Sequence, residues 1–336
     1  MEKLIVKNFG PLVHVDIEIK DINIYIGITS SGKSTIAKLI SIFKSGINRI
    51  ELFEKALSNY NIDFNIGSDT LIRYEVGELF TEIKGNGFET NRLKKQQIHA
   101  LNPIYIPAER VFFATLSQSI FSLMSSDVAL PKWLIDFGAK FENARTNIKE
   151  MAIDFLGAKY RWQDGTDYIE VRNDTTIKLS QASSGIQSIV PLLLVVQHNS
   201  EPSKKEDDIF VIEEPELNLY PSSQKDLVEF IMERINISQD KLIITTHSPY
   251  LLTTIDNLIQ AGNIVNERPE LQDEVKKLVP ESLWLDFDSV SCYFFSDGSS
   301  CSTLDPELRS IGPSNIDDVS AELSNTFENL LTLRYS

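Results

Sequence analysis

Short apolar runs alternate with polar positions over residues 3–27, which is the pattern of half-buried β-strands. Residues 3–19 hold two such runs with a Gly-Pro pair between them, so we expect an antiparallel pair of strands. The next run, 22–26, predicts a buried strand. Apolar residues then recur at helical spacing over residues 34–58, which predicts a helix directly after these strands.

The middle of the chain predicts antiparallel strands and helices. Residues 68–93 are expected to form a hairpin whose turn lies at residues 85–87, and residues 104–106 are expected to form a short strand. Residues 110–155 are expected to be mainly helical, with their aromatic side chains packed in the core. Residues 168–179 then predict another pair of strands.

The second half of the chain alternates between apolar runs and helical patterns. The expected elements are helix 184–198, strand 209–213, helix 221–236, strand 241–245, helix 249–262, a strand near 290–295 and a helix near 315–333. Strands that alternate with helices in this way favour a parallel sheet with crossover helices.

Composition narrows the class of protein. The chain has 336 residues, enough for one large domain or two modest ones, and 42% of them are hydrophobic, so a sizeable core is expected. No stretch has the roughly 20 apolar residues that a bilayer-spanning helix needs, and the first residues are too interrupted by charge for a signal peptide. The two cysteines, Cys292 and Cys301, suit a reducing cytosol. We therefore expect a soluble, cytoplasmic protein without membrane contact.

Charge argues against a general affinity for nucleic acid. The formal net charge is −16, and an acidic surface repels DNA phosphates. A local basic stretch at Arg92, Lys94 and Lys95 is either a solvated helix face or a nucleic-acid contact. DNA binding therefore remains possible but is not indicated by the net charge.

A glycine-rich loop follows the buried strand at 22–26. Residues 27–35 fit the pattern G-x-x-x-x-G-K-[ST] and precede a helical pattern, as a phosphate-binding loop requires. Backbone N–H groups at a helix N-terminus hold phosphate oxygens, Lys33 would reach the β- and γ-phosphates, and Ser34 would ligate Mg²⁺. The expected nucleotide-binding residues are Gly27, Ser30, Ser31, Gly32, Lys33, Ser34 and Thr35. The motif alone names only a superclass that includes kinases, GTPases, helicases and transporters.

Two carboxylates end a second apolar strand. Residues 209–212 are apolar, and Glu213 and Glu214 follow, which is where ligand sites form in α/β sheets. Glu213 is expected to hold Mg²⁺ directly or through water. Glu214 is expected to polarise the water that attacks the γ-phosphate.

Two further motifs narrow the family. Ser183-Ser184-Gly185-Ile186-Gln187 lies before the acidic strand, and Thr246-His247-Ser248-Pro249 follows the next apolar run. Together with the phosphate loop and the acidic pair, these motifs resemble the ABC ATPases in the same order. The segment Glu213-Glu214-Pro215-Glu216 makes the resemblance closer to the RecF/SMC/OLD-like branch, and to small prokaryotic AAA family ATPases without a Toprim domain.

The resemblance implies a fold and further site residues. It implies an α/β P-loop NTPase, an ABC-ATPase head with a mixed central sheet, an N-terminal antiparallel β portion and a helical insertion. The whole chain, 1–336, would be one head, with its nucleotide-binding core in 1–40 and 180–336 and a β hairpin plus helical insertion in 41–179. His247 would contact the γ-phosphate. The signature residues that would contact ATP on the opposite subunit are Ser183, Ser184, Gly185 and Gln187.

Some positions depart from the family pattern or have no clear role. Ile186 replaces the second glycine of the signature, and Glu213 stands where the family more often has Asp. Gln96 and Gln97 are weak candidates for the glutamine loop. Arg110 ends a segment, residues 106–110, that resembles one in small prokaryotic ATPases. It is assigned no firm role, and an internal salt bridge is favoured over a role as catalytic cation.

Three functions are consistent with these residues. The first is a cytosolic switch that hydrolyses ATP with Mg²⁺ and forms a homodimer or larger homo-oligomer around it. Such a switch would act in phage defence or DNA repair with a separate nuclease or toxin subunit. The second is the nucleotide-binding subunit of a membrane transporter, and the third is an ATP sensor or scaffold with negligible turnover.

Overall fold

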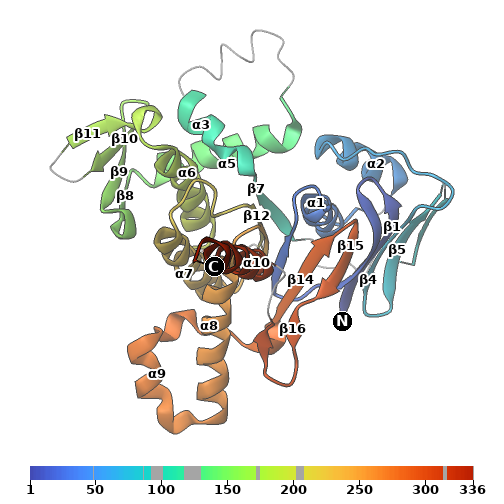
Figure 1. The fold of residues 1–336 in the computed structure, drawn as a ribbon. Helices are drawn as coiled ribbons and strands as arrows, with labels where there is room; N and C mark the ends of the chain where they lie inside the picture. Colours follow the sequence, from blue (N-terminus) through green and yellow to red (C-terminus); the bar gives the residue numbers. More distant parts are fainter. Residues whose placement is uncertain are drawn as a thin grey trace.

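The computed structural model describes residues 1–47, 49–85, 87–91, 101–116, 130–171, 175–201, 208–312 and 316–335, the side chains of 316–323 excepted. Its centre is an 11-stranded mixed sheet with the order β6-β5-β4-β1-β2-β15-β14-β3-β13-β12-β7 (Figure 1). The expected α/β class with a mixed central sheet is therefore confirmed.

Five neighbouring strands of this sheet run parallel. They are β14 (Val290–Ser296), β3 (Ile22–Gly27), β13 (Lys241–Thr246), β12 (Asp208–Glu213) and β7 (Asn102–Ile106). Every residue of β3 and of β12 is buried, as expected for strands that are covered on both faces. The parallel arrangement brings the ends of β3, β12 and β13 to one edge of the sheet, where the expected site residues begin.

The other half of the sheet is mainly antiparallel. It contains β1 (Glu2–Phe9), β2 (Leu12–Glu18), β4 (Leu71–Val76), β5 (Leu79–Lys84), β6 (Gly87–Thr90) and β15 (Ser299–Ser302). The expected β1–β2 pair is present. The region 68–93 differs from the prediction, because it holds two successive hairpins rather than one. Gly77 supplies the additional turn, with a left-handed φ of 60°.

The helix expected at 34–58 is two helices. α1 (Lys33–Lys44) ends at Ser45-Gly46, where Gly46 has a φ of 78°, and α2 (Ile50–Asn59) follows. A left-handed glycine at this position ends a helix readily, and the apolar periodicity on either side conceals the break. α1 packs against β3, β13, β12 and β7 and so covers one face of the parallel strands.

The described residues of the region 110–155 are mainly helical, as predicted, but the region ends in a strand that was not expected. Its helices are η1 (Ala108–Arg110), α3 (Val111–Leu116) and α5 (Lys132–Asn147). A four-stranded antiparallel sheet then forms beside α5 and α6, made of β8 (Glu150–Ile153), β9 (Ala158–Gln163), β10 (Thr166–Val171) and β11 (Thr175–Lys178) (Figure 1). Only β10 and β11 were expected. Buried Arg145 of α5 pairs with buried Asp167 of β10 at 2.9 Å, which fastens the two parts together.

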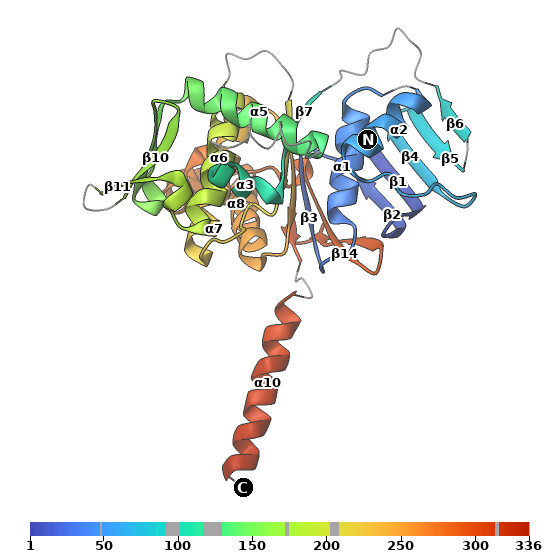
Figure 2. The same cartoon turned by 90° about the horizontal axis from the view of Figure 1, so that it is seen from above.

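The alternating second half agrees with the prediction in its main elements. α6 (Ser184–Asn199), α7 (Pro221–Ser238) and α8 (Pro249–Glu267) lie across the parallel strands from α1 (Figure 2). Smaller elements that were not predicted are α9 (Gln272–Leu278), β16 (Leu304–Asp305) and β17 (Ser310–Ile311). Short 3-10 helices lie at Asp154–Leu156, Leu179–Gln181, Pro269–Leu271, Glu281–Leu283 and Phe287–Ser289.

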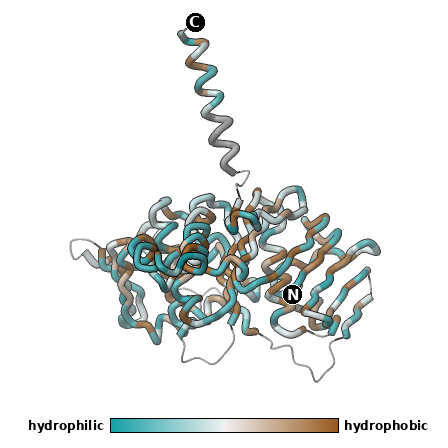
Figure 3. The backbone as a smooth tube through the Cα atoms, turned by 90° about the horizontal axis from the view of Figure 1, so that it is seen from below, coloured by the Kyte–Doolittle hydropathy of each residue, from teal (hydrophilic) through white to brown (hydrophobic). Residues whose placement is uncertain are grey.

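The last helix, α10 (Ile316–Tyr335), stands away from the rest of the molecule (Figure 2). In the body of the molecule, the most hydrophobic stretches of the chain run through the central strands (Figure 3). Within the described part of the chain, no helix combines the length and the apolar character that crossing a bilayer requires.

Candidate functional site

The phosphate loop, residues 27–35, connects β3 to α1 and depends on its two glycines. Gly27 has a φ of 153°, and a Cβ there would lie 2.0 Å from the carbonyl oxygen of Phe295. Gly32 has a φ of 99°, and a Cβ there would lie 2.2 Å from the Leu12 side chain. No side chain caps the first turn of α1, so its N–H groups remain available to an anion.

A cavity of about 610 Å³ lies over this loop. Its lining consists of Pro11, Thr29, Ser30, Ser31, Gly32, Lys33, Ser34, Thr35, Phe64, Glu214 and His247. Ser31 is buried, and its hydroxyl has no hydrogen-bond partner among the described residues. The structure therefore brings together the expected loop residues with Glu214 and His247. Phe64 is an addition that the sequence did not indicate.

Lys33, His247 and Glu214 form one contact cluster at this cavity. The Lys33 ammonium donates to the carbonyl oxygens of Gly27 at 3.0 Å and Ile28 at 2.9 Å, and lies 3.3 Å from His247 Nε2. His247 Nε2 also lies 3.2 Å from Glu214 Oε1. Burial lowers the pKa of Lys33, and burial together with the neighbouring ammonium lowers the pKa of His247.

Glu214 retains its proton more strongly than an ordinary glutamate. Burial, followed by the charge of Glu216, raises the pKa of Glu214 to about 8, although Lys33 acts in the opposite direction. The backbone at Glu214 is left-handed, with a φ of 43°, and its N–H donates to the Thr245 carbonyl at 2.9 Å. A carboxyl with a pKa near neutral fits a group that accepts a proton at physiological pH.

Replacing Glu214 with glutamine is expected to stabilise the fold, and more at pH about 8.5 than at pH about 5.5. In the folded chain, Glu214 stays protonated up to about pH 8, whereas in the unfolded chain it loses its proton near the ordinary glutamate pKa of 4.5. Wild-type stability therefore falls as pH rises between these values, whereas glutamine has no charge to bury. The expected gain near pH 8.5 is about 1 kcal/mol after allowance for solvent screening. Urea unfolding at both pH values measures it, and a gain that does not change with pH contradicts the raised pKa.

Glu216 organises the segment that carries His247. Its Oε1 accepts hydrogen bonds from the Thr246 hydroxyl at 2.6 Å and from the His247 N–H at 2.8 Å. The sequence placed Glu216 in the acidic motif without a role. A third carboxylate so close to the first two was the available signal, but its partners became visible only in the fold.

Glu213 and Ser34 are the candidate metal ligands. Glu213 is buried, and its Oε1 has no hydrogen-bond partner among the described residues. Ser34 is exposed and lines the cavity. No group of three His, Cys, Asp or Glu side chains in the described chain could hold a metal alone. These few oxygen donors fit Mg²⁺, which keeps several waters and takes further ligands from substrate phosphates.

Arg110 anchors the end of the acidic strand. The guanidinium is fully buried and donates to five carbonyl oxygens, and all five bonds go to the backbone. Burial lowers its pKa to about 10. The acceptors are Pro107, Ser188, Glu213, Glu214 and Pro215. Arg110 is therefore a structural clamp, rather than the internal salt bridge or the catalytic cation expected from the sequence.

The signature residues begin α6 and lie outside the cavity lining. Ser183 caps the helix by accepting from the Ile186 N–H, and Ser183 and Ser184 are exposed. Gln187 donates to the carbonyl oxygens of Ser180 at 3.1 Å and Ala182 at 2.8 Å. A Cβ on Gly185 would lie 2.8 Å from the Asn218 carbonyl, so the helix start packs against the loop that follows the acidic strand.

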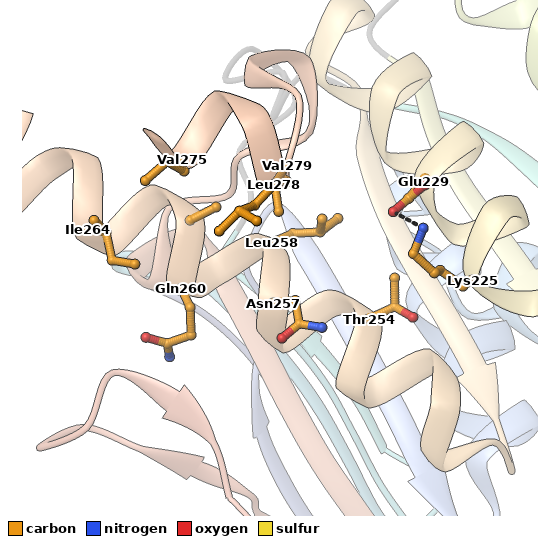
Figure 4. Close-up of a pocket in the computed structure, with 11 residues that line it drawn as sticks. Lys225, Glu229, Thr254, Asn257, Leu258, Gln260, Ile264, Val275, Leu278 and Val279 are labelled. Carbon is orange, nitrogen blue, oxygen red and sulfur yellow. Dashed lines mark ion pairs between the residues drawn. The ribbon is translucent and has the colours of Figure 1, made fainter. Parts of the chain in front are cut away.

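Other candidates lie elsewhere. Gln96, Gln97 and the basic stretch at 92–95 fall outside the described residues. A second cavity of about 350 Å³ lies among α7, α8 and α9, and the Lys225–Glu229 ion pair spans 2.8 Å at one side of it (Figure 4). It contains none of the expected site residues.

One protein-family model matches part of the chain. Residues 89–252 match the model of the AAA ATPase domain family, a range that includes the signature, the acidic strand and His247 but not the phosphate loop. No curated protein sequence matches the chain.

Several solved structures resemble the chain over most of its length. An SMC head bound to the C-winged helix domain of ScpA has 13% identity and a TM-score of 0.46, covering 91% of this chain and 98% of that one. The SMC head domain from Thermotoga maritima has 15% identity and a TM-score of 0.43, covering 89% and 97%. The recombination mediator RecF has 11% identity and a TM-score of 0.41, covering 89% and 97%.

The family match and the order of the motifs on the parallel strands agree with each other. The glycine loop ends β3, the acidic pair ends β12, and the His247 segment follows β13, the strand between them. Residues 89–252 are therefore similar to an AAA ATPase domain, and the chain carries a phosphate-loop motif ahead of them.

Proposed function

We propose that this protein is a switch that binds and hydrolyses ATP, and that two copies enclose each nucleotide. One observation carries the proposal. The cavity over the phosphate loop contains Lys33, Glu214 and His247, while the exposed start of α6 lies outside its lining. A helix N-terminus with exposed serines is suited to bind an anion. Because the start of α6 lies outside the cavity of its own head, the anion would be a phosphate of the ATP bound to a second copy.

A connected surface supports this pairing. Gly185 packs on Asn218, Glu216 binds the His247 segment, and His247 contacts Lys33. The four motifs therefore belong to one continuous set of contacts. Large apolar side chains are exposed along these same segments, namely Ile28, Leu217, Tyr220 and Tyr250. Aromatic and aliphatic side chains of this kind are typical of the centre of a protein interface.

Four residues of the cavity lining, Lys33, Ser34, Glu214 and His247, have proposed tasks, as does the buried Glu213. Lys33 would exchange its bonds to loop carbonyls and His247 for the β- and γ-phosphate oxygens. Glu214 would accept a proton from the water that attacks the γ-phosphate, and its near-neutral pKa suits this role. His247, freed from Lys33, would hold the γ-phosphate. Ser34 and Glu213 would hold Mg²⁺, which supplies positive charge to the phosphate oxygens when it is bound.

The proposed switch depends on ATP binding more tightly to the closed pair of heads than to separate heads. ATP bound between two heads favours the closed pair, and hydrolysis removes the γ-phosphate that both heads contact. We further propose action with a separate effector, a nuclease or toxin, in phage defence or DNA repair, in a cytoplasmic setting. This part rests on the motif resemblance alone. The net charge of −16 favours a protein partner over nucleic acid.

Replacing Ser184 with arginine is expected to reduce ATP turnover at least about 10-fold while leaving ATP affinity of a single head unchanged. The long cation would fill the space where the start of α6 meets the partner's nucleotide. Turnover and equilibrium binding of a fluorescent ATP analogue measure the two effects. Ser58→Arg, at an exposed position of α2, is the matched control. Equal loss of binding and turnover contradicts a shared site, and wild-type protein that binds ATP without turnover favours the sensor function.

A further inference from the structure

Tyr105 lies on β7, next to β12, the strand that ends in Glu213. It lies opposite Val211 of β12. Alternate residues of a strand point to the same face, so Tyr105 shares a face with Glu213. α1 covers this face, and the Lys38 ammonium of α1 lies 5.9 Å from the centre of the Tyr105 ring. The phenol therefore lies on the face of the sheet that α1 covers, the same face as the carboxylate expected to hold Mg²⁺.

The ring of Tyr105 is fixed by aromatic neighbours. Its centre lies 5.4 Å from that of Tyr60 and 6.0 Å from that of Trp133, both in edge-to-face geometry. The whole side chain is only 5% exposed. Such packing restricts the hydroxyl to a small volume next to the strand end.

The polar atoms at this position are not satisfied within the described chain. Tyr105 Oη, Glu213 Oε1 and, on the next strand, Thr245 Oγ1 are all buried without a hydrogen-bond partner. Glu213 is nevertheless close enough to Tyr105 to raise the pKa of the phenol, after burial as the main cause. Buried polar atoms are rarely left unpaired, and a group of them suggests a place for ordered water.

We propose that Tyr105 is a positioning residue for the metal site, whose hydroxyl holds the Glu213 carboxylate through a shared water molecule. This orients Glu213 for the divalent cation that accompanies ATP. The inference rests on the proposed function. Partners that orient a metal ligand in this way typically contribute 10–100-fold to metal affinity. An entirely structural tyrosine would contribute to stability instead.

Tyr105→Phe separates these two roles, because it removes one oxygen and keeps the ring. With ATP present, Mn²⁺ affinity measured by electron paramagnetic resonance is expected to fall about 10-fold. ATP affinity in EDTA is expected to remain at the wild-type value. The melting temperature is expected to stay close to that of wild type, because the ring keeps its packing and no direct hydrogen bond to another protein group is lost. Tyr60→Phe is the matched control, since it removes the hydroxyl from the ring that packs edge-to-face on Tyr105.

Three outcomes overturn the inference. One is Mn²⁺ affinity of Tyr105→Phe equal to that of wild type and Tyr60→Phe. Another is an equal loss of ATP affinity in EDTA. The third is a full effect of Tyr105→Phe in a Glu213→Gln background, because the role of Tyr105 runs through Glu213. Wild-type protein that binds no Mn²⁺ with ATP overturns the proposed function itself, so the two failures are distinguishable.

Discussion

Replacing Arg110 with methionine is expected to lower the free energy of unfolding by about 3–5 kcal/mol. Methionine fills much of the volume but leaves five carbonyl oxygens without their donor. Three of these belong to Glu213, Glu214 and Pro215, so the end of the acidic strand loses its anchor together with stability. Urea unfolding measures the effect.

Arg309→Met is the matched control. Arg309 is partly exposed and pairs with surface carboxylates at 3.1 and 3.5 Å, so its loss is expected to change stability by less than about 1 kcal/mol. Similar losses in the two variants contradict the clamp. Arg110→Lys is expected to recover only part of the stability, because an ammonium donates at most three hydrogen bonds.

Replacing Glu214 with glutamine is expected to reduce ATP turnover about 10²–10⁴-fold. The amide keeps the shape of the side chain but cannot accept the proton of the attacking water. ATP affinity is expected to be retained or increased, because the amide that replaces Glu214 carries no negative charge to repel the phosphates. Phosphate release under saturating Mg-ATP measures turnover. Glu229→Gln, in the surface ion pair with Lys225, is the control. Turnover of Glu214→Gln within about 3-fold of wild type contradicts the role of Glu214.

The parallel core and its motifs were predictable because their signals are local and strong. β3 and β12 are unbroken apolar runs, and each leads directly into residues whose chemistry depends on short spacing. The glycine at 27 and the lysine at 33 must follow a strand and start a helix, and the structure has this order. The acidic pair and His247 were placed by the same reasoning on adjacent strands.

The remaining features depend on contacts between distant segments. Gly46 interrupts an apolar periodicity that otherwise continues, so one helix was expected where two occur. The strand β8 lies at the end of a region that was expected to be helical, and β9 lies outside every expected element. Both became recognisable only through pairing, of β8 with β9 and of β9 with β10. Arg110 binds carbonyls about one hundred residues away, and no spacing rule indicates such a partner. Tyr105 shows its relation to Glu213 only once β7 lies beside β12.

The most direct test of a nucleotide shared by two heads is the mass of Glu214→Gln protein by light scattering, with and without Mg-ATP. The account predicts that Mg-ATP doubles the mass, or the mass of any larger assembly, because the trapped ATP holds two heads together. Adding Ser184→Arg to the same protein is expected to abolish this increase while ATP still binds. An unchanged mass of ATP-bound Glu214→Gln protein, or the same doubling in the double variant, contradicts the shared site.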